Sequence, residues 1–441
     1  EDDTTMVAAT RSKRAMEAKK EKELVKVKKD GSKGEVGSAP NKYVSLAGKT
    51  HVLFLLLTLV PFALQALDLL PEDSQVSEVT REALGKIMVP QCYRGHRIHL
   101  SCLLALAEAI APTFCTGMLI ILTASSIIYG GSWRSVRSEA GRNRDDAPVS
   151  MTKGDAMRFP VMGSVVLLSL FAAIKLLPKE LLTLCLGLYF MLLGTFAISA
   201  TILPFMERIL PSFFSRMKVK LGFLNLLPKS VKLFLFETDE DLSELEISGC
   251  EIICGIGSAV FCWWYHKTRH WVANNTIGLS FCMQGIEMLS LGSVQVGVIL
   301  LSGLFFYDIF WVFFTPVMVT VAKSFDAPIK LLFLKSVSDG KPTFSMLGLG
   351  DIVIPGIYLA LLLRMDQKRG FEKSGYFKFV LGAYVLGLLA TLVVMHVFQH
   401  AQPALLYLVP AILGSTFLLA AKKGEIKFIF NYSEEEEAQE K

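Results

Sequence analysis

Residues 294–318 read VQVGVILLSGLFFYDIFWVFFTPVM, an apolar run whose single charged side chain is Asp308. A run of this kind is long enough for a bilayer-spanning α-helix, which needs about 20 apolar residues. An aspartate at the centre of such a helix costs roughly 2.5–3.5 kcal/mol, whereas each Leu, Ile, Phe or Val returns about 0.3–0.6 kcal/mol. The stretch is therefore predicted to be a membrane helix that can afford a buried acid.

A second acid lies in the next apolar block, residues 344–364, which read FSMLGLGDIVIPGIYLALLLR. Asp351 follows Gly348 and Gly350 in this block, and Pro355 comes soon after. The same estimate gives a free energy of membrane insertion near zero for this block, so we expect its insertion to depend on neighbouring helices. One buried aspartate could simply bind a buried partner, but two in successive spans favour a function.

The rest of the chain is organised in the same way. Hydrophobic residues make up 52% of the 441 positions, and the mean hydropathy is +0.47. The apolar blocks are continuous and do not alternate with period two, which argues against a β-barrel. We predict an all-α polytopic membrane protein with nine transmembrane helices. The predicted spans are 109–131, 158–177, 181–204, 246–265, 271–291, 294–318, 344–364, 376–398 and 402–421.

Composition also divides the chain outside these spans. We predict a basic, disordered N-terminal region at 1–50, an extra hydrophobic segment at 51–70 (a signal anchor or an additional span), a polar linker at 71–108, a nine-helix domain at 109–421 and an acidic tail at 422–441. The net charge of +5 lies in tails and loops without a nucleic-acid-binding motif, so we expect no nucleic acid partner.

The basic residues of the loops predict the orientation. If the first of the nine spans runs from lumen to cytosol, the cytosolic loops hold roughly twice as many Lys and Arg residues as the lumenal loops. The C-terminus is then cytosolic. Glu287, near the end of a predicted span, is interpreted as a side chain that reaches toward the membrane surface.

The chemistry of the two acids fits peptide hydrolysis. Two carboxylates close together in a low dielectric cannot both ionise easily, so they share one proton. One can then take a proton from water while the other polarises the peptide carbonyl, and no metal or cofactor is required. Gly348 and Gly350 remove side chains just before Asp351, which lets a substrate strand or a neighbouring helix approach the backbone.

Three motifs together identify a family. They are Tyr307-Asp308, Gly348-Leu349-Gly350-Asp351 and Gln402-Pro403-Ala404-Leu405, in this order and in three predicted spans. The chain resembles the presenilin and signal peptide peptidase superfamily, with the closer match to signal peptide peptidases, over about 109–430. None of the three motifs would be sufficient alone.

The resemblance implies the following assignments. Asp308 and Asp351 are catalytic, and the residues that shape the site are Tyr307, Gly348, Leu349, Gly350, Gln402, Pro403, Ala404 and Leu405. The activity is that of an aspartic-type intramembrane endopeptidase that cleaves type II-oriented transmembrane segments, including remnant signal peptides, in the endoplasmic reticulum membrane. Partners are these transmembrane peptides and membrane lipids, and a homo-oligomer is left open.

Two other functions remain as alternatives at this point. A polytopic transporter or proton-coupled carrier could use the two aspartates to bind ions, and matched broken helices in internal repeats would favour it. We find no convincing repeat. A non-proteolytic membrane scaffold could share the fold, although an intact pair of aspartates argues against it.

Overall fold

The computed structural model describes residues 98–141, 150–220, 246–324, 327–338, 341–370, 375–398 and 402–434. All of them belong to one compact unit, Leu53–Lys441. The predicted basic region at 1–50, the extra hydrophobic segment at 51–70 and most of the predicted linker lie outside the described residues. Their assignments therefore stay predictions.

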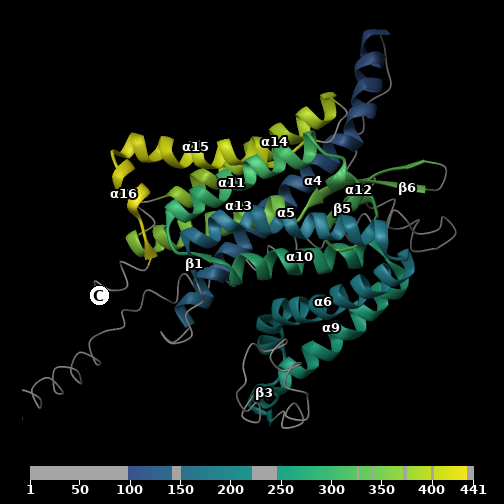
Figure 1. Ribbon diagram of the computed structural model, residues 1–441, viewed down its shortest axis with the longest axis vertical. Helices are drawn as coiled ribbons and strands as arrows, with labels where there is room; N and C mark the ends of the chain where they lie inside the picture. Colours follow the sequence, from purple (N-terminus) through teal and green to yellow (C-terminus); the bar gives the residue numbers. More distant parts are fainter. Residues whose placement is uncertain are drawn as a thin grey trace, which may run out of the picture. The chain divides into compact units, whose positions relative to one another are not determined.

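Each of the nine predicted apolar blocks contains a long α-helix, although the block 344–364 begins in a strand (Figure 1). These helices are α4 (Ile98–Gly141), α5 (Lys153–Leu176), α6 (Lys179–Ile209), α9 (Gly249–Thr268), α10 (Trp271–Met288), α11 (Val294–Phe313), α13 (Gly350–Arg369), α14 (Tyr376–Phe398) and α15 (Leu405–Lys423). Shorter helices are α7 (Ser212–Arg216), α12 (Val317–Ser324) and α16 (Ile426–Asn431). The protein is thus a polytopic helical membrane protein.

Six helices in the described part of the chain are long and apolar enough to cross a membrane by themselves: α4, α5, α6, α11, α14 and α15. Helices α9, α10 and α13 do not meet this criterion, because they carry polar and charged residues. In α13 every residue from Pro355 to Asp366 is buried. A helix enclosed by protein on all sides does not need an apolar outer face.

Small residues let the helices around α13 approach closely. A Cβ added at Gly356 of α13 would lie 2.5 Å from the side chain of Ile286 in α10, and one at Gly297 of α11 would lie 2.5 Å from the ring of Tyr358. Only glycine fits at such positions without displacing its neighbour, which is how small residues act at membrane helix interfaces. The core therefore holds α10, α11 and α13 in direct contact.

Two strands form a β-hairpin in the region between α12 and α13, for which the sequence predicted a loop and the start of a helix. Strand β5 (Lys330–Ser338) pairs antiparallel with β6 (Lys341–Gly348), with Lys330 opposite Gly348. The prediction of a helix over 344–349 was therefore wrong. A short apolar run cannot be assigned to strand or helix by periodicity alone. Here Leu331 and Phe333 point into the core, where both are almost fully buried.

Two asparagines of α10 form hydrogen bonds with the backbone of β5, along the edge that does not pair with β6. Asn275 donates through Nδ2 to the carbonyl of Leu332 at 2.6 Å and accepts from the N–H of Leu332 at 2.8 Å. Asn274 donates to the carbonyl of Lys330 at 2.8 Å. These bonds satisfy backbone groups that would otherwise be buried without partners. The hairpin is in this way fixed to α10.

The opposite end of the bundle gathers three connections that lie far apart in the sequence (Figure 1). Strand β1 (Ser150–Met151) pairs in parallel with β4 (Ser290–Leu291), and Ser293 forms a bridge with Ser433. A further short pair, β2 (Lys218–Lys220) with β3 (Glu246–Ser248), precedes α9. Three of the connections that were predicted to lie on the same side of the membrane are thus joined by backbone pairing.

Ion pairs reinforce this end. Buried Arg134 of α4 pairs with Glu287 of α10 at 2.7 Å, and Arg364 of α13 pairs with Glu434 at 2.8 Å. The interpretation of Glu287 as a side chain that reaches for the membrane surface was therefore wrong. Its carboxylate is mostly enclosed and neutralises an arginine, which is the condition under which charges are tolerated inside proteins.

Candidate active site

Asp308 lies in the last third of α11, and its side chain is buried with 6% of its surface exposed. Its Oδ2 accepts a hydrogen bond from the backbone N–H of Leu405 at 3.2 Å. Leu405 is the first residue of α15, and the residue before it, Ala404, provides no side-chain cap. The first N–H groups of a helix have no partner within the helix, and they carry partial positive charge. The carboxylate of Asp308 therefore caps α15.

Asp351 lies one residue after the start of α13 and three residues beyond Gly348, the end of β6. This change from strand to helix places the acid where the hairpin meets the helical core. A Cβ added at Gly348 would lie 3.2 Å from Oδ2 of Asp351, whereas one at Gly350 would meet only Ile354, at 3.8 Å. Gly348 thus leaves space for the carboxylate itself, while Gly350 shows no comparable crowding.

The two helices that carry the acids pack against each other. Helices α11 and α13 pack together, and both contact α15, whose first backbone N–H binds Asp308. The structure therefore brings the two sequence-predicted catalytic residues into one site, although they lie in different helices. It also brings the start of α15 to the same site through Leu405.

The other residues of the three motifs have varied roles. Tyr307 packs its ring against α5 at Gly163, and Leu349 packs against α10 at Gly278. Gln402 accepts a 3.4 Å hydrogen bond from the hydroxyl of Tyr407. Pro403 and Ala404 accept the N–H groups of the first turn of α15 through their carbonyls. Among these residues, only Leu405 has a hydrogen bond to an aspartate side chain within the described structure.

Sequence reasoning did not identify Tyr384, a fully buried residue of α14. Its hydroxyl donates to the backbone carbonyl of Asp351 at 3.3 Å. A clue was present in the sequence, because Pro355 lies four residues after Asp351 and has no N–H to offer that carbonyl. The clue predicts that a donor is needed but does not say which residue supplies it.

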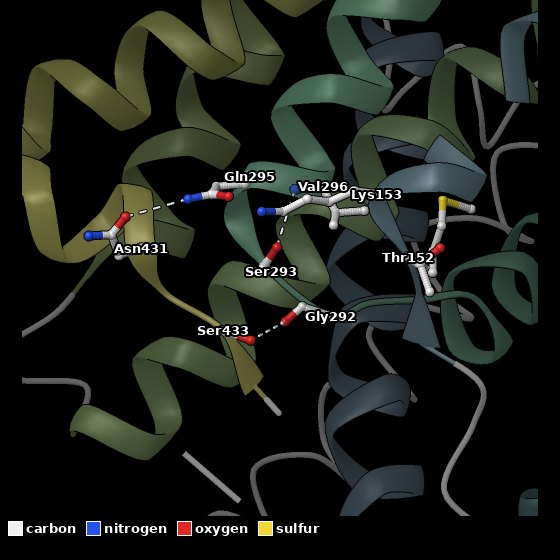
Figure 2. A pocket seen from close by; sticks show the side chains of 9 residues that line it. Thr152, Lys153, Gly292, Ser293, Gln295, Val296, Asn431 and Ser433 are labelled. Atoms are coloured by element: carbon white, nitrogen blue, oxygen red, sulfur yellow. Dashed lines mark hydrogen bonds between the residues drawn. The ribbon is translucent and has the colours of Figure 1, made fainter. Parts of the chain in front are cut away.

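A polar cavity of about 510 Å³ lies at the other end of the bundle, lined by residues that include Lys153, Ser293, Gln295 and Asn431 (Figure 2). Asp308 is fourteen residues beyond Val294 on α11, a distance of roughly 21 Å along a helix. The cavity is therefore separate from the aspartates. Among the described residues, no group of three or more His, Cys, Asp or Glu is placed to hold a metal ion.

Paired aspartates inside a polytopic helical membrane protein define the class of intramembrane aspartyl proteases. Comparison with known proteins agrees with this class. The family model described as Signal peptide peptidase matches residues 143–436. Signal peptide peptidase of Homo sapiens is 44% identical over 330 residues, which cover 74% of this chain and 85% of the human protein.

Two further relatives give the same result. Signal peptide peptidase of Mus musculus is 44% identical over 330 residues, 74% of this chain and 84% of the mouse protein. Intramembrane protease 2 of Caenorhabditis elegans is 50% identical over 182 residues, 38% of this chain and 39% of the worm protein. The chain belongs to the signal peptide peptidase family, and its activity is that of an intramembrane aspartyl endopeptidase. The comparisons give no support to a carrier or a non-proteolytic scaffold.

Proposed function

We propose that Asp308 and Asp351 are the catalytic pair of this protease, and that its substrates are type II-oriented transmembrane segments, including remnant signal peptides. The observation that carries the proposal is the packing of the two helices that bear the acids, α11 and α13, inside the membrane domain, with Asp308 bound at the start of α15. Burying two acids together is unfavourable unless they share a proton, and a shared proton is what acid–base hydrolysis of a peptide bond uses.

The reaction needs three events at this pair. The ionised carboxylate takes a proton from a water molecule, which attacks the carbonyl carbon of the scissile peptide bond. The protonated carboxyl group polarises the carbonyl oxygen. The amine then leaves with a proton as the C–N bond breaks. Because Asp308 and Asp351 are coupled, acid and base roles belong to the pair, and neither residue has a fixed role.

The start of α15 supports this chemistry through its backbone. The N–H of Leu405 holds Oδ2 of Asp308 and stabilises its ionised form, since hydrogen bonds to a carboxylate favour the charge. Gln402, Pro403 and Ala404 bring the first turn of α15 to that position. We infer that this motif acts by presenting a helix start to the acid.

The hairpin offers a route for the substrate. Strand β6 pairs with β5 on one edge, and its other edge has no strand partner in the described part of the chain. Its last residue, Gly348, is separated by Leu349 alone from the helix that carries Asp351. An extended segment added to that edge would bring its peptide bonds toward the acids. We therefore expect good substrates to contain helix-breaking residues, because a helical amide is shielded from attack.

We further propose that the protein resides in the endoplasmic reticulum membrane with a cytosolic C-terminus. The excess of basic residues in the loops on one side supports this orientation. Exposed apolar side chains on α5, α6 and α9, among them Val165, Leu192 and Val260, provide a surface for membrane lipids.

The catalytic assignment is tested with the full chain reconstituted in lipid and a type II signal-peptide substrate. We expect Asp308→Asn and Asp351→Asn each to lower cleavage at least a thousandfold, because neither amide can act as base or acid. Asp155→Asn, which changes an exposed carboxylate in the first turn of α5, is the matched control and should retain full activity. Cleavage at the wild-type rate by either site variant would overturn the assignment.

A further inference from the structure

The backbone carbonyl of Asp351 lacks its usual partner. In an α-helix this carbonyl accepts from the N–H four residues later. That residue is Pro355, which lies inside α13 and has no N–H. A carbonyl without a partner is costly inside a membrane protein, where water is scarce. The carbonyl that lacks a helical donor therefore belongs to Asp351, the second of the two acids.

Tyr384 fills this gap from a neighbouring helix. Its hydroxyl donates to the carbonyl of Asp351 at 3.3 Å, a long but direct contact between α14 and the first turn of α13. The side chain is fully buried, with 0% of its surface exposed. The tyrosine is therefore held by packing, and it restrains the backbone of the residue that it contacts.

A second proline in the chain shows the same arrangement. Pro204 interrupts α6 and leaves the carbonyl of Ala200 without a helical donor. Nη2 of buried Arg134, from α4, donates to that carbonyl at 3.0 Å. In both places a buried side chain from another helix replaces the missing N–H. At α6 the replacement joins two helices, whereas at α13 it acts on a site residue.

We propose that Tyr384 is a positioning residue for Asp351. Its hydroxyl fixes the first peptide units of α13 and so sets the direction in which the carboxylate of Asp351 points toward Asp308. The inference rests on the proposed catalytic role of Asp351. A small displacement of a catalytic group is enough to slow a reaction greatly, so a single backbone hydrogen bond can affect the rate.

The test combines the loss of the hydroxyl with the return of the missing N–H. Tyr384→Phe keeps the ring and removes the donor, and we expect kcat to fall about tenfold with KM within about twofold of wild type. Pro355→Ala supplies a helical N–H to the same carbonyl. The double variant Tyr384→Phe/Pro355→Ala should therefore match Pro355→Ala alone in kcat.

A tyrosine on the same helix gives the matched control. The hydroxyl of Tyr376 donates to Glu425 at 3.0 Å, two turns before Tyr384 and away from the acids. Tyr376→Phe loses one hydroxyl of the same kind and should keep the wild-type kcat. The pH profile of kcat is measured for all variants, because we expect only Tyr384→Phe to alter it and its change to be reversed by Pro355→Ala.

The outcomes separate this proposal from the catalytic assignment. A wild-type kcat for Tyr384→Phe, while Asp351→Asn is inactive, overturns the positioning role alone. An active Asp351→Asn overturns the assignment of Asp351. If Tyr384→Phe does not fold, the comparison of the double variant with Pro355→Ala still decides, since a kcat about tenfold lower in the double variant would contradict the proposal.

Discussion

The backbone N–H of Leu405 lies 3.2 Å from Oδ2 of Asp308 and donates to it, so the first residue of α15 is held by an acid of α11. The bond depends on the main chain at 405 and not on its side chain. The leucine side chain is itself buried, with 5% exposed, and packs in the core. The two contributions can be separated by choosing which of them a substitution removes.

We therefore expect different results from two substitutions at Leu405. Leu405→Ala keeps the N–H and loses packing, so the unfolding temperature should fall while kcat changes less than about threefold. Leu405→Pro removes the donor at a position where helices accept proline, and kcat per folded molecule should fall at least tenfold. Equal kcat values for the two variants would show that the N–H does not matter to the reaction.

Gly348 should be more sensitive than Gly350 to the addition of a methyl group. In Gly348→Ala the new Cβ would lie 3.2 Å from Oδ2 of Asp351 and would push the carboxylate aside. We expect kcat to fall at least tenfold, because misplacing a catalytic group is costly. Gly350→Ala places its methyl group 3.8 Å from Ile354, an ordinary contact, and serves as the comparison. A larger loss from Gly350→Ala would contradict this account.

Asn275 should be important for the stability of the hairpin. Asn275→Leu leaves the N–H and the carbonyl of Leu332 without the partners that they have in α10. Each buried group that loses its hydrogen-bond partner lowers the stability by about 1–3 kcal/mol, so the unfolding temperature should drop clearly. Asn274→Leu removes a single bond to the backbone of β5 and should cost less. Thermal unfolding of both variants in the same detergent checks this order.

Glu425 makes the stability depend on acid pH. Arg369 donates two hydrogen bonds to its carboxylate, at 2.7 and 3.0 Å, and this partner lowers the pKa of Glu425 to about 2. The unfolded chain has a pKa near 4.3 for this residue. The stabilisation is therefore complete above about pH 5 and is lost as the pH falls toward 2.

The variant Glu425→Gln isolates this contribution. Glutamine does not titrate, so the unfolding temperature of the variant should fall less steeply than that of wild type between pH 5 and pH 3. The two proteins should differ most at neutral pH, where the wild-type ion pair is intact. Parallel curves for the two proteins over this range would disprove the role of Glu425.

The helices could be predicted from the sequence because hydrophobic length is a local property. Asp308 and Asp351 could also be selected, since each raises the cost of inserting its own span. The hairpin could not, because a short run of mixed polar and apolar residues such as 341–348 fits a strand or the start of a helix. Pro342 and Gly348 were the residues that hinted at the outcome.

Partners that are distant in sequence were beyond local reasoning. Asn275 is 57 residues from Leu332, Tyr384 is 33 residues from Asp351, and Arg134 is 153 residues from Glu287. Each is a polar residue in an apolar helix, which indicates that a partner exists. Only the packing of the helices determines which group that partner is.

The enclosure of α13 also bears on how the protein is made. A segment with so little hydropathy has weak affinity for lipid when it leaves the translocon, and it needs protein to receive it. Helices α4 and α10, which pack against it, are encoded earlier in the chain and are synthesised first. Two helices against which α13 packs are thus already synthesised when the ribosome reaches the helix that carries Asp351.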